Sequence, residues 1–303
     1  MADFFQYIHA VGTGTKGNRD LSHEEAFEMM TQILNQEATP EQISAFLLGW
    51  RIKPETIEEF HGALAACDAL VQKQPLQDSL ELGYPFDGKV NNPYMLPLIA
   101  KILEDVGLDL VSYTDLWQPA KKGITLQDIS SKIDTAKNLH LFERKDYLPQ
   151  LHALTSIRKN LGLRTGLNTL EKLPYVTQSR YALTGVFHKP YVKKHIDIFA
   201  NRYERFALIQ GNEGTPELFS KGRLWLHQNG EVQEFIIDPH DYGIEYTKSW
   251  EKITLNESIA QTNEPSEAFY KLAKLNAAVQ LFIAQRFASI DEAFEYLQSK
   301  EGL

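Results

Sequence analysis

The sequence predicts an α/β protein in two parts, a small helical bundle followed by a larger domain built on a central, mostly parallel sheet. Two observations lead to this expectation. Apolar residues recur at helical spacing through about the first seventy residues, and from residue 79 onward strand-like and helix-like segments alternate. Such alternation is typical of a parallel sheet covered by helices on both faces. We expect a helical domain over 1–72, joined by helices around 146–172, and an α/β domain over 76–303.

The first two helices enclose a glycine-rich stretch. Phe4, Ile8 and Val11 lie at helical spacing, and "DLSHEEAFEMMTQIL" offers Asp20 or Ser22 as the N-cap of a second helix. The intervening "GTGTKG" matches the G-x-G-x-x-G fingerprint of dinucleotide-binding loops, which requires a buried strand before its first glycine. Because a helix precedes it here, the sequence favours a flexible connector over a nucleotide site.

Two further helices complete the bundle. "TPEQISAFLLGWRI" places Thr39 as N-cap and Pro40 at the first helical position, and the fourth helix begins after "KPET". Each carries one apolar stripe. Short amphipathic helices of this kind must pack on one another or on a partner.

Strands and helices then alternate towards the end of the chain. The hairpin at 222–237 carries Asn229 and Gly230, the strongest short signal for a tight turn between strands. The other elements that the pattern predicts are strands at 79–86, 108–113, 181–187 and 205–211 and helices at 92–107, 190–203, 265–287 and 289–300.

The composition excludes several classes of protein. No apolar run approaches the ~18 residues of a membrane span, and the first residues lack the pattern of a signal peptide. Cys67 is the only cysteine, so no intramolecular disulfide can form. The nine histidines show no H-x-x-x-H or H-E-x-x-H spacing, and no G-x-S-x-G elbow is present. We expect a cytoplasmic protein with no membrane association.

The net charge of -9 conceals an uneven distribution. Residues 1–75 hold five Lys or Arg against eleven Asp or Glu, whereas residues 121–205 hold sixteen against seven. One interpretation is charge scattered over solvated helix faces. The other is a basic surface for a polyanion.

Four stretches, at residues 38–68, 157–173, 182–219 and 270–284, follow one another over nearly the whole chain. Together they resemble the anthranilate phosphoribosyltransferase family (glycosyltransferase family 3), in the wider group that includes pyrimidine nucleoside phosphorylases. "ATPEQISAFLLGWRIKPETIEEFHGALAACD" resembles its helical domain, and "IRKNLGLRTGLNTLEKL" resembles its R-x-x-L-G-x-R-T-x-x-N-x-L-G-P-L motif. "ALTGVFHKPYVKKHIDIFANRYERFALIQGNEGTPELF" resembles the segment from V-x-G-V-x-x-P to H-G-x-x-G-x-D-E, and "YKLAKLNAAVQLFIA" resembles the N-A-A-x-x-L-Y helix. The resemblance implies a nucleoside phosphorylase/phosphoribosyltransferase-like fold, a homodimer formed through the helical domain, and phosphoribosyl transfer from phosphoribosyl pyrophosphate (PRPP) to anthranilate.

The phosphate loop departs from the family pattern. Where the family has G-T-G-G-D and then N-I-S-T, this chain reads "LGYPFDGKVNNPYMLP", with Tyr84, Pro85 and Phe86 where small residues are expected. Proline removes a backbone donor, and two aromatic side chains fill space. The K-H-G-N-R motif is also missing, because the corresponding place reads "SYTDLWQP". The candidates that the resemblance leaves for substrate binding are Gly83, Asp87, Gly88, Lys89, Asn92 and Arg164.

The metal loop is altered as well, whereas one arginine of the anthranilate site is kept. Glu217 is retained, but Pro216 stands at the position of the family's aspartate, so the carboxylate pair that holds Mg²⁺ is halved unless Glu213 compensates. We therefore expect no certain cofactor, and Mg²⁺ only if PRPP is bound. Arg164 matches the arginine that faces the anthranilate carboxylate, for which its planar fork is well suited, although it could instead hold the hinge between domains.

These departures favour a changed function. "NTLEKL" and "GTGTKGNRDLS" resemble a paralogous branch of the family that binds nucleic acid through a basic groove, which implies non-specific binding of DNA or RNA. The alternatives are an active phosphoribosyl or glycosyl transferase with a remodelled PRPP loop, and a purely structural dimer partner. The basic residues expected to contact phosphates are Lys16, Arg19, Lys121, Lys122, Lys145, Arg158, Lys159, Lys172, Arg180, Lys193 and Lys194.

Overall fold

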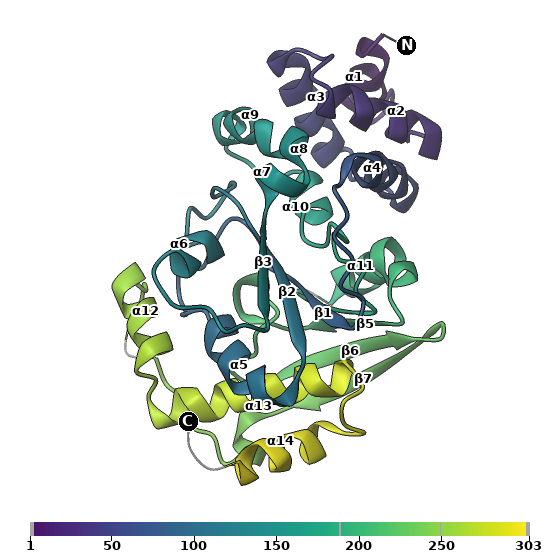
Figure 1. The fold of residues 1–303 in the computed structure, drawn as a ribbon. Helices are drawn as coiled ribbons and strands as arrows, with labels where there is room; N and C mark the ends of the chain where they lie inside the picture. The colour runs from purple at the N-terminus through teal and green to yellow at the C-terminus, as the bar shows by residue number, and fades with distance from the viewer. Residues whose placement is uncertain (1–2, 188, 249, 301–303) are drawn as a thin grey trace.

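Four helices form the N-terminal domain of the computed structural model, which describes residues 3–187, 189–248 and 250–300. Three of them begin with a capping box, in which the side chain of Ser22, Thr39 or Thr56 accepts a hydrogen bond from the backbone N–H of the third helical residue. This arrangement satisfies backbone donors that have no partner inside the helix, and it confirms Thr39 as an N-cap. The helices are α1 (Phe5–Gly12), α2 (His23–Leu34), α3 (Pro40–Ile52) and α4 (Ile57–Leu70) (Figure 1).

A buried carboxylate joins the helices of this bundle. Glu59 in α4 is fully buried and accepts hydrogen bonds from the indole N–H of Trp50 at 2.8 Å and the backbone N–H of Leu21 at 2.9 Å. Lys53 lies 2.9 Å from the same carboxylate. Trp50 packs between Phe46 and Phe60, with ring centroids 5.6 and 5.5 Å away, so polar and apolar contacts together hold α3 against α4.

Seven strands form the sheet of the larger domain, in the order β3-β2-β1-β4-β5-β6-β7. The first five in this order are parallel, and β6 and β7 continue the sheet antiparallel. The tight turn between β6 and β7 is confirmed at Asn229 and Gly230, both of which have positive φ. The strands are β1 (Ser79–Gly83), β2 (Asp109–Thr114), β3 (Leu139–Glu143), β4 (Tyr181–Gly185), β5 (Arg205–Ile209), β6 (Gly222–Gln228) and β7 (Glu231–Ile237).

Helices cover both faces of the sheet, so the α/β architecture is confirmed (Figure 1). Helices α5 (Leu96–Leu103), α13 (Glu267–Ile283) and α14 (Ile290–Ser299) lie on one side of the sheet and share one apolar core with it. Helix α11 (Pro190–Phe199) packs on the other face, where a second apolar core also includes the helical domain. The remaining helices are α6 (Leu126–Ser130), α7 (Arg144–Tyr147), α8 (Pro149–Ala153), α9 (Thr155–Leu161), α10 (Leu167–Leu170) and α12 (Leu255–Asn263). The 3₁₀ turns are η1 (Glu104–Val106), η2 (Ala200–Arg202), η3 (Asn212–Gly214) and η4 (Pro239–Tyr242).

Several boundaries differ from the expected ones. The strand expected over 79–86 ends at Gly83, and the helix expected from residue 92 begins at Leu96. Pro85 has no N–H to continue a strand ladder, so the chain leaves the sheet before it. Strand β3 and helices α6 and α12 are additional to the expected elements. No helix among the described residues is both long and apolar enough to span a membrane.

Candidate functional site: the cleft between the domains

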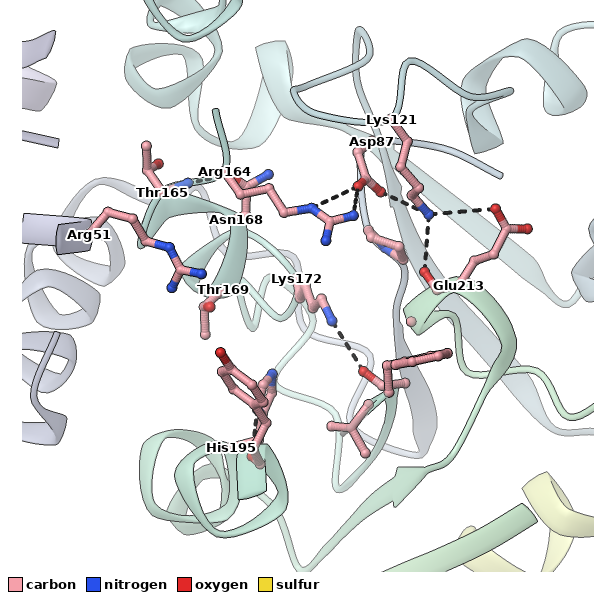
Figure 2. A pocket seen from close by; sticks show the side chains of 16 residues that line it. Arg51, Asp87, Lys121, Arg164, Thr165, Asn168, Thr169, Lys172, His195 and Glu213 are labelled. Atoms are coloured by element: carbon pink, nitrogen blue, oxygen red, sulfur yellow. Dashed lines mark hydrogen bonds and ion pairs between the residues drawn. The ribbon is translucent and has the colours of Figure 1, made fainter. Parts of the chain in front are cut away.

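A cleft of about 460 Å³ lies between the helical domain and the carboxyl ends of β1 and β4. Arg51 enters it from α3, on the side opposite Asp87 and Lys121 (Figure 2). Helix α11 contributes His195, Lys172 follows α10, and the loops after β1, β4 and β5 complete the lining. In parallel α/β sheets, ligands bind outside the carboxyl ends of the strands, so this cleft is the main candidate for a functional site.

Two of the expected substrate-binding residues, Asp87 and Arg164, bind each other. The Asp87 carboxylate accepts hydrogen bonds from Arg164 Nε at 3.0 Å and from its Nη2, and Lys121 Nζ lies 3.3 Å from its other oxygen (Figure 2). Gly88 follows with φ of +77°, and a Cβ there would lie 2.5 Å from the backbone of Gly123. This turn requires glycine, and it fixes Asp87 between the two cations.

Glu217 is fully buried and accepts four hydrogen bonds. Its donors are the Tyr84 hydroxyl at 2.8 Å, the backbone N–H groups of Met95 at 2.7 Å and Leu96 at 3.0 Å, and Lys89 Nζ. Met95 and Leu96 form the N-terminus of α5, where unpaired N–H groups favour an anion. Burial lowers the pKa of Lys89, although Glu217 favours its charged form. A carboxylate of the chain itself therefore occupies the anion-binding end of α5.

The loop that contains Glu217 also holds the phosphate-loop segment through a second acid. Glu213 accepts hydrogen bonds from the backbone N–H groups of Val90 at 2.7 Å and Asn91 at 3.1 Å, and Asn92 donates its amide to Asn212 at 2.7 Å. Gly83, the remaining loop candidate, is buried at the end of β1, where a Cβ would come within 2.7 Å of Thr184.

The groups around Glu217 do not fit a Mg²⁺ site in this arrangement. Within the part of the chain that the structure describes, no three His, Cys, Asp or Glu side chains lie together so as to hold a metal ion. Glu217, the expected metal ligand, faces a buried lysine and two backbone amides rather than a second carboxylate. Its metal role stays a prediction.

Lys172 and His195 line the cleft from neighbouring elements. Lys172 Nζ donates to the Gly185 carbonyl at 3.2 Å, and burial lowers its pKa to about 8, with Arg164 and Lys121 adding to the effect. His195 is bonded through Nδ1 to the Tyr191 carbonyl at 2.9 Å, and burial lowers its pKa to about 3. The imidazole is therefore neutral at physiological pH, while Lys172 exchanges its proton more readily than an ordinary lysine.

A buried ionic network below the cleft was missed by the sequence analysis. Glu171 accepts hydrogen bonds from Arg158 at 2.5 and 3.0 Å and from Arg144 at 2.7 Å, and Arg144 Nε lies 3.2 Å from Asp115. Burial opposes ionisation of Glu171, but the two guanidinium groups outweigh it and lower its pKa. His152 Nδ1 completes the chain, 2.7 Å from Asp115. Arg158, expected to contact phosphates, is thus only 1% exposed.

Most of the other basic candidates lie opposite acids. The ion pairs are Arg19–Glu25, Lys145–Glu143, Arg180–Glu204, Lys193–Asp197 and Lys194–Glu55, besides those of Lys121. The first four of these pairs are largely exposed, and such pairs contribute little to stability and can exchange partners, whereas Glu55 in the fifth is buried. Lys16 is exposed in the connector after α1.

A cation–aromatic cluster, which we call the Trp117 cluster, consists of Trp117, Lys122 and Lys159. The two ammonium groups lie 5.6 and 4.5 Å from the ring centroid of Trp117. Lys122 follows Lys121 of the cleft, and Lys159 lies on α9, five residues before Arg164. The cluster brings the loop after β2 beside α9, which residue spacing alone could not show.

Comparisons with known proteins agree with this architecture. Residues 5–70 match the helical bundle domain of a glycosyl transferase family, and residues 124–300 match its a/b domain. An uncharacterized protein of Aquifex aeolicus is 30% identical over 90% of this chain and 91% of its own length. An anthranilate phosphoribosyltransferase of Neisseria gonorrhoeae is 26% identical over 94% of this chain and 90% of its own length.

Solved structures share the fold at lower identity. The anthranilate phosphoribosyltransferase of Thermus thermophilus superimposes with a TM-score of 0.76 at 17% identity, over 98% of this chain and 93% of that one. The enzyme of Saccharomyces cerevisiae in complex with PRPP and Mg superimposes with a TM-score of 0.76 at 15% identity, over 98% and 92%. The two domain matches occur in the family's order along the chain, and the fold agrees with them. The protein therefore belongs to the glycosyl transferase family that includes the anthranilate phosphoribosyltransferases.

Proposed function

We propose that this protein is a cytoplasmic, nucleic-acid-binding member of its family that binds DNA or RNA without sequence preference and does not use PRPP. The observation that carries the proposal is the occupation of the α5 N-terminus by Glu217. A phosphate bound at Met95 and Leu96 would have to displace a fully buried carboxylate that already satisfies both amides and Lys89. Such a displacement leaves polar groups without partners and is costly.

The Trp117 cluster supports the nucleic-acid part of the proposal. No ion pair of Lys122 or Lys159 occurs among the described residues, so both ammonium groups remain available for phosphates. Phosphate contacts from lysines give affinity without sequence information, and an aromatic ring beside them suits unpaired bases. Inside the cleft, Arg164 and Lys121 are paired with Asp87, whereas Arg51 makes only a 3.9 Å ion pair with Glu55 and adds a further positive charge.

Salt dependence tests this role. The change is the double substitution Lys122→Ala with Lys159→Ala, and the measurement is the fluorescence anisotropy of a labelled single-stranded oligonucleotide between about 50 and 200 mM salt. Loss of two phosphate contacts should reduce the slope of log K against log salt by about 1.4. Lys271→Ala, which removes an exposed lysine from α13, is the matched control. An unchanged slope, or no binding by the wild type at the lowest salt, contradicts the proposal.

The second candidate is a phosphoribosyl transferase, which the relatives' names and the position of Arg164 in the cleft favour. Any Mg²⁺ would then enter with PRPP. Isothermal titration calorimetry with millimolar PRPP and Mg²⁺ distinguishes this transferase from the proposed nucleic-acid-binding protein. We expect no heat of binding from the wild type, and a saturating isotherm would establish the transferase alternative instead.

We also propose a homodimer formed through the helical domain. Phe5 on α1 and Leu48 and Ile52 on α3 are exposed apolar side chains, with 70% exposure at Ile52. Analytical ultracentrifugation should show a dimer for the wild type and a monomer for Ile52→Glu. A wild type that stays monomeric at micromolar concentration rules the dimer out.

A further inference from the structure

The lining of the cleft combines charged, hydroxyl-bearing and aromatic side chains. Cationic and hydroxyl-bearing side chains come from α3 and from the region of α10, and Asp87 and Glu213 add two acids. Phe187, after β4, and Tyr191, at the start of α11, form what we call the apolar wall. Phe187 is 64% exposed and Tyr191 is 42% exposed. The volume of about 460 Å³ falls within the ~300–1,000 Å³ of ordinary small-molecule pockets. The cleft therefore suits a ligand that carries both a flat apolar part and an anion.

The anion has a restricted choice of partners. Asp87 already opposes Arg164 and Lys121. Arg51 makes only a 3.9 Å ion pair with Glu55, and the Lys172 ammonium donates to one carbonyl, as far as the described residues show. Arg51 and Lys172 are therefore the cations best able to receive a phosphate, and they come from the two separate domains. Figure 2 shows Arg51 reaching into the cleft toward the side where Thr169 and Lys172 lie.

The apolar wall is suited to a base rather than to a second anion. His195, next to Tyr191 in the wall, is neutral because burial lowers its pKa to about 3. An aromatic ring in such a wall can stack on any base, since every base has a π-face.

We propose that the cleft receives one unpaired nucleotide of a bound strand, with its base against Phe187 and Tyr191 and its phosphate between Arg51 and Lys172. This inference rests on the proposed nucleic-acid-binding function and makes it specific for single strands or strand ends. A base inside a duplex is stacked and paired, and it enters a pocket only after both contacts are broken.

The test compares single-stranded and duplex oligonucleotides of equal length by fluorescence anisotropy. Tyr191→Ala removes the stacking ring and Lys172→Met removes the ammonium group, while Tyr191→Phe keeps the ring. We expect Tyr191→Ala and Lys172→Met to weaken single-strand binding about tenfold and to leave duplex binding within about twofold. Tyr191→Phe should bind as the wild type does. The controls are Ile236→Ala, an exposed apolar side chain on β7, and Lys271→Met on α13.

A second readout keeps the test independent of small losses in folding. An oligonucleotide with 2-aminopurine at its end should lose fluorescence on binding the wild type and Tyr191→Phe, but less on binding Tyr191→Ala. If Tyr191→Ala and Lys172→Met weaken single-strand and duplex binding equally, or change neither, the assignment of the nucleotide to the cleft is wrong while nucleic-acid binding stands. If the wild type binds neither oligonucleotide, the proposed function itself fails.

Discussion

Removing the Glu217 carboxylate should destabilise the protein strongly, because four buried donors depend on it. Glu217→Ala leaves the Tyr84 hydroxyl and the amides of Met95 and Leu96 without an acceptor. At about 1–3 kcal/mol for each unsatisfied group, this loss alone is at least about 3 kcal/mol. The ammonium of Lys89 also loses its counterion, which costs about 3–5 kcal/mol if it stays charged and less if it releases its proton. We expect the free energy of unfolding to fall by about 5 kcal/mol in all.

Urea denaturation followed by circular dichroism measures this loss, and an added anion tests its cause. Glu217→Gln keeps one acceptor oxygen, so it should cost about 2 kcal/mol and remain folded if the alanine variant does not. Phosphate or acetate at about ten times its dissociation constant should return about 1.4 kcal/mol to Glu217→Ala and nothing to the wild type, at constant ionic strength. A loss below about 1 kcal/mol for Glu217→Ala would refute the network as the stabilising feature of this loop.

Three further predictions concern the scaffold, each read from urea midpoints. Glu81 is fully buried in β1, and burial raises the pKa of its carboxyl, so its ionised form disfavours folding. The wild type should therefore lose stability relative to Glu81→Gln as the pH rises from about 4 through the raised pKa, and a constant difference would contradict this. Gly88→Ala should cost about 2 kcal/mol or more, because φ is positive there and the added Cβ meets the backbone of Gly123. Gly107→Ala should cost only about 1 kcal/mol, because Gly107 has positive φ but open space around its Cα. Equal losses would count against the close approach of Gly88 to Gly123. Glu171→Leu should cost about 3–5 kcal/mol, since it leaves the buried guanidinium of Arg158 without a carboxylate and Arg144 with Asp115 alone. A neutral result would show that Arg158 pairs elsewhere.

Local signals predicted the scaffold better than the site. Ser22 and Thr39 act as N-caps, and Asn229 with Gly230 closes the hairpin, because each of these depends on neighbours within a few residues. Strand β3 was missed because "LHLFE" alternates polar and apolar residues over only five positions, and its place at the sheet edge leaves it half-buried.

The partners of the charged groups could not be read from local spacing. Glu217 bonds to Met95, 122 residues away, so its place in the chain suggested a loop acid facing solvent or metal. Arg158 looks like a surface residue on a short helix until α9 and α10 bring it to Glu171. The Trp117 cluster likewise depends on a loop and a helix that meet only in the folded chain. Of the residues proposed from the sequence, Asp87, Lys121, Arg164 and Lys172 line the cleft, and only the fold showed which charges neutralise each other.

The buried ionic network gives the junction between the domains a mechanical property. Asp115 follows β2, Arg144 is in α7, Arg158 is in α9 and Glu171 follows α10. Helix α9 contacts α3 and helix α10 contacts α4, so the network ties the end of β2 to short helices on which the bundle packs. A change in the angle between the domains that pulled Asp115 from Arg144, or Glu171 from either arginine, would separate charges in a place that water does not reach. Large hinge motions are thereby penalised at this point. Because Lys172 of the cleft directly follows Glu171, we expect this side of the cleft to move little when a ligand binds.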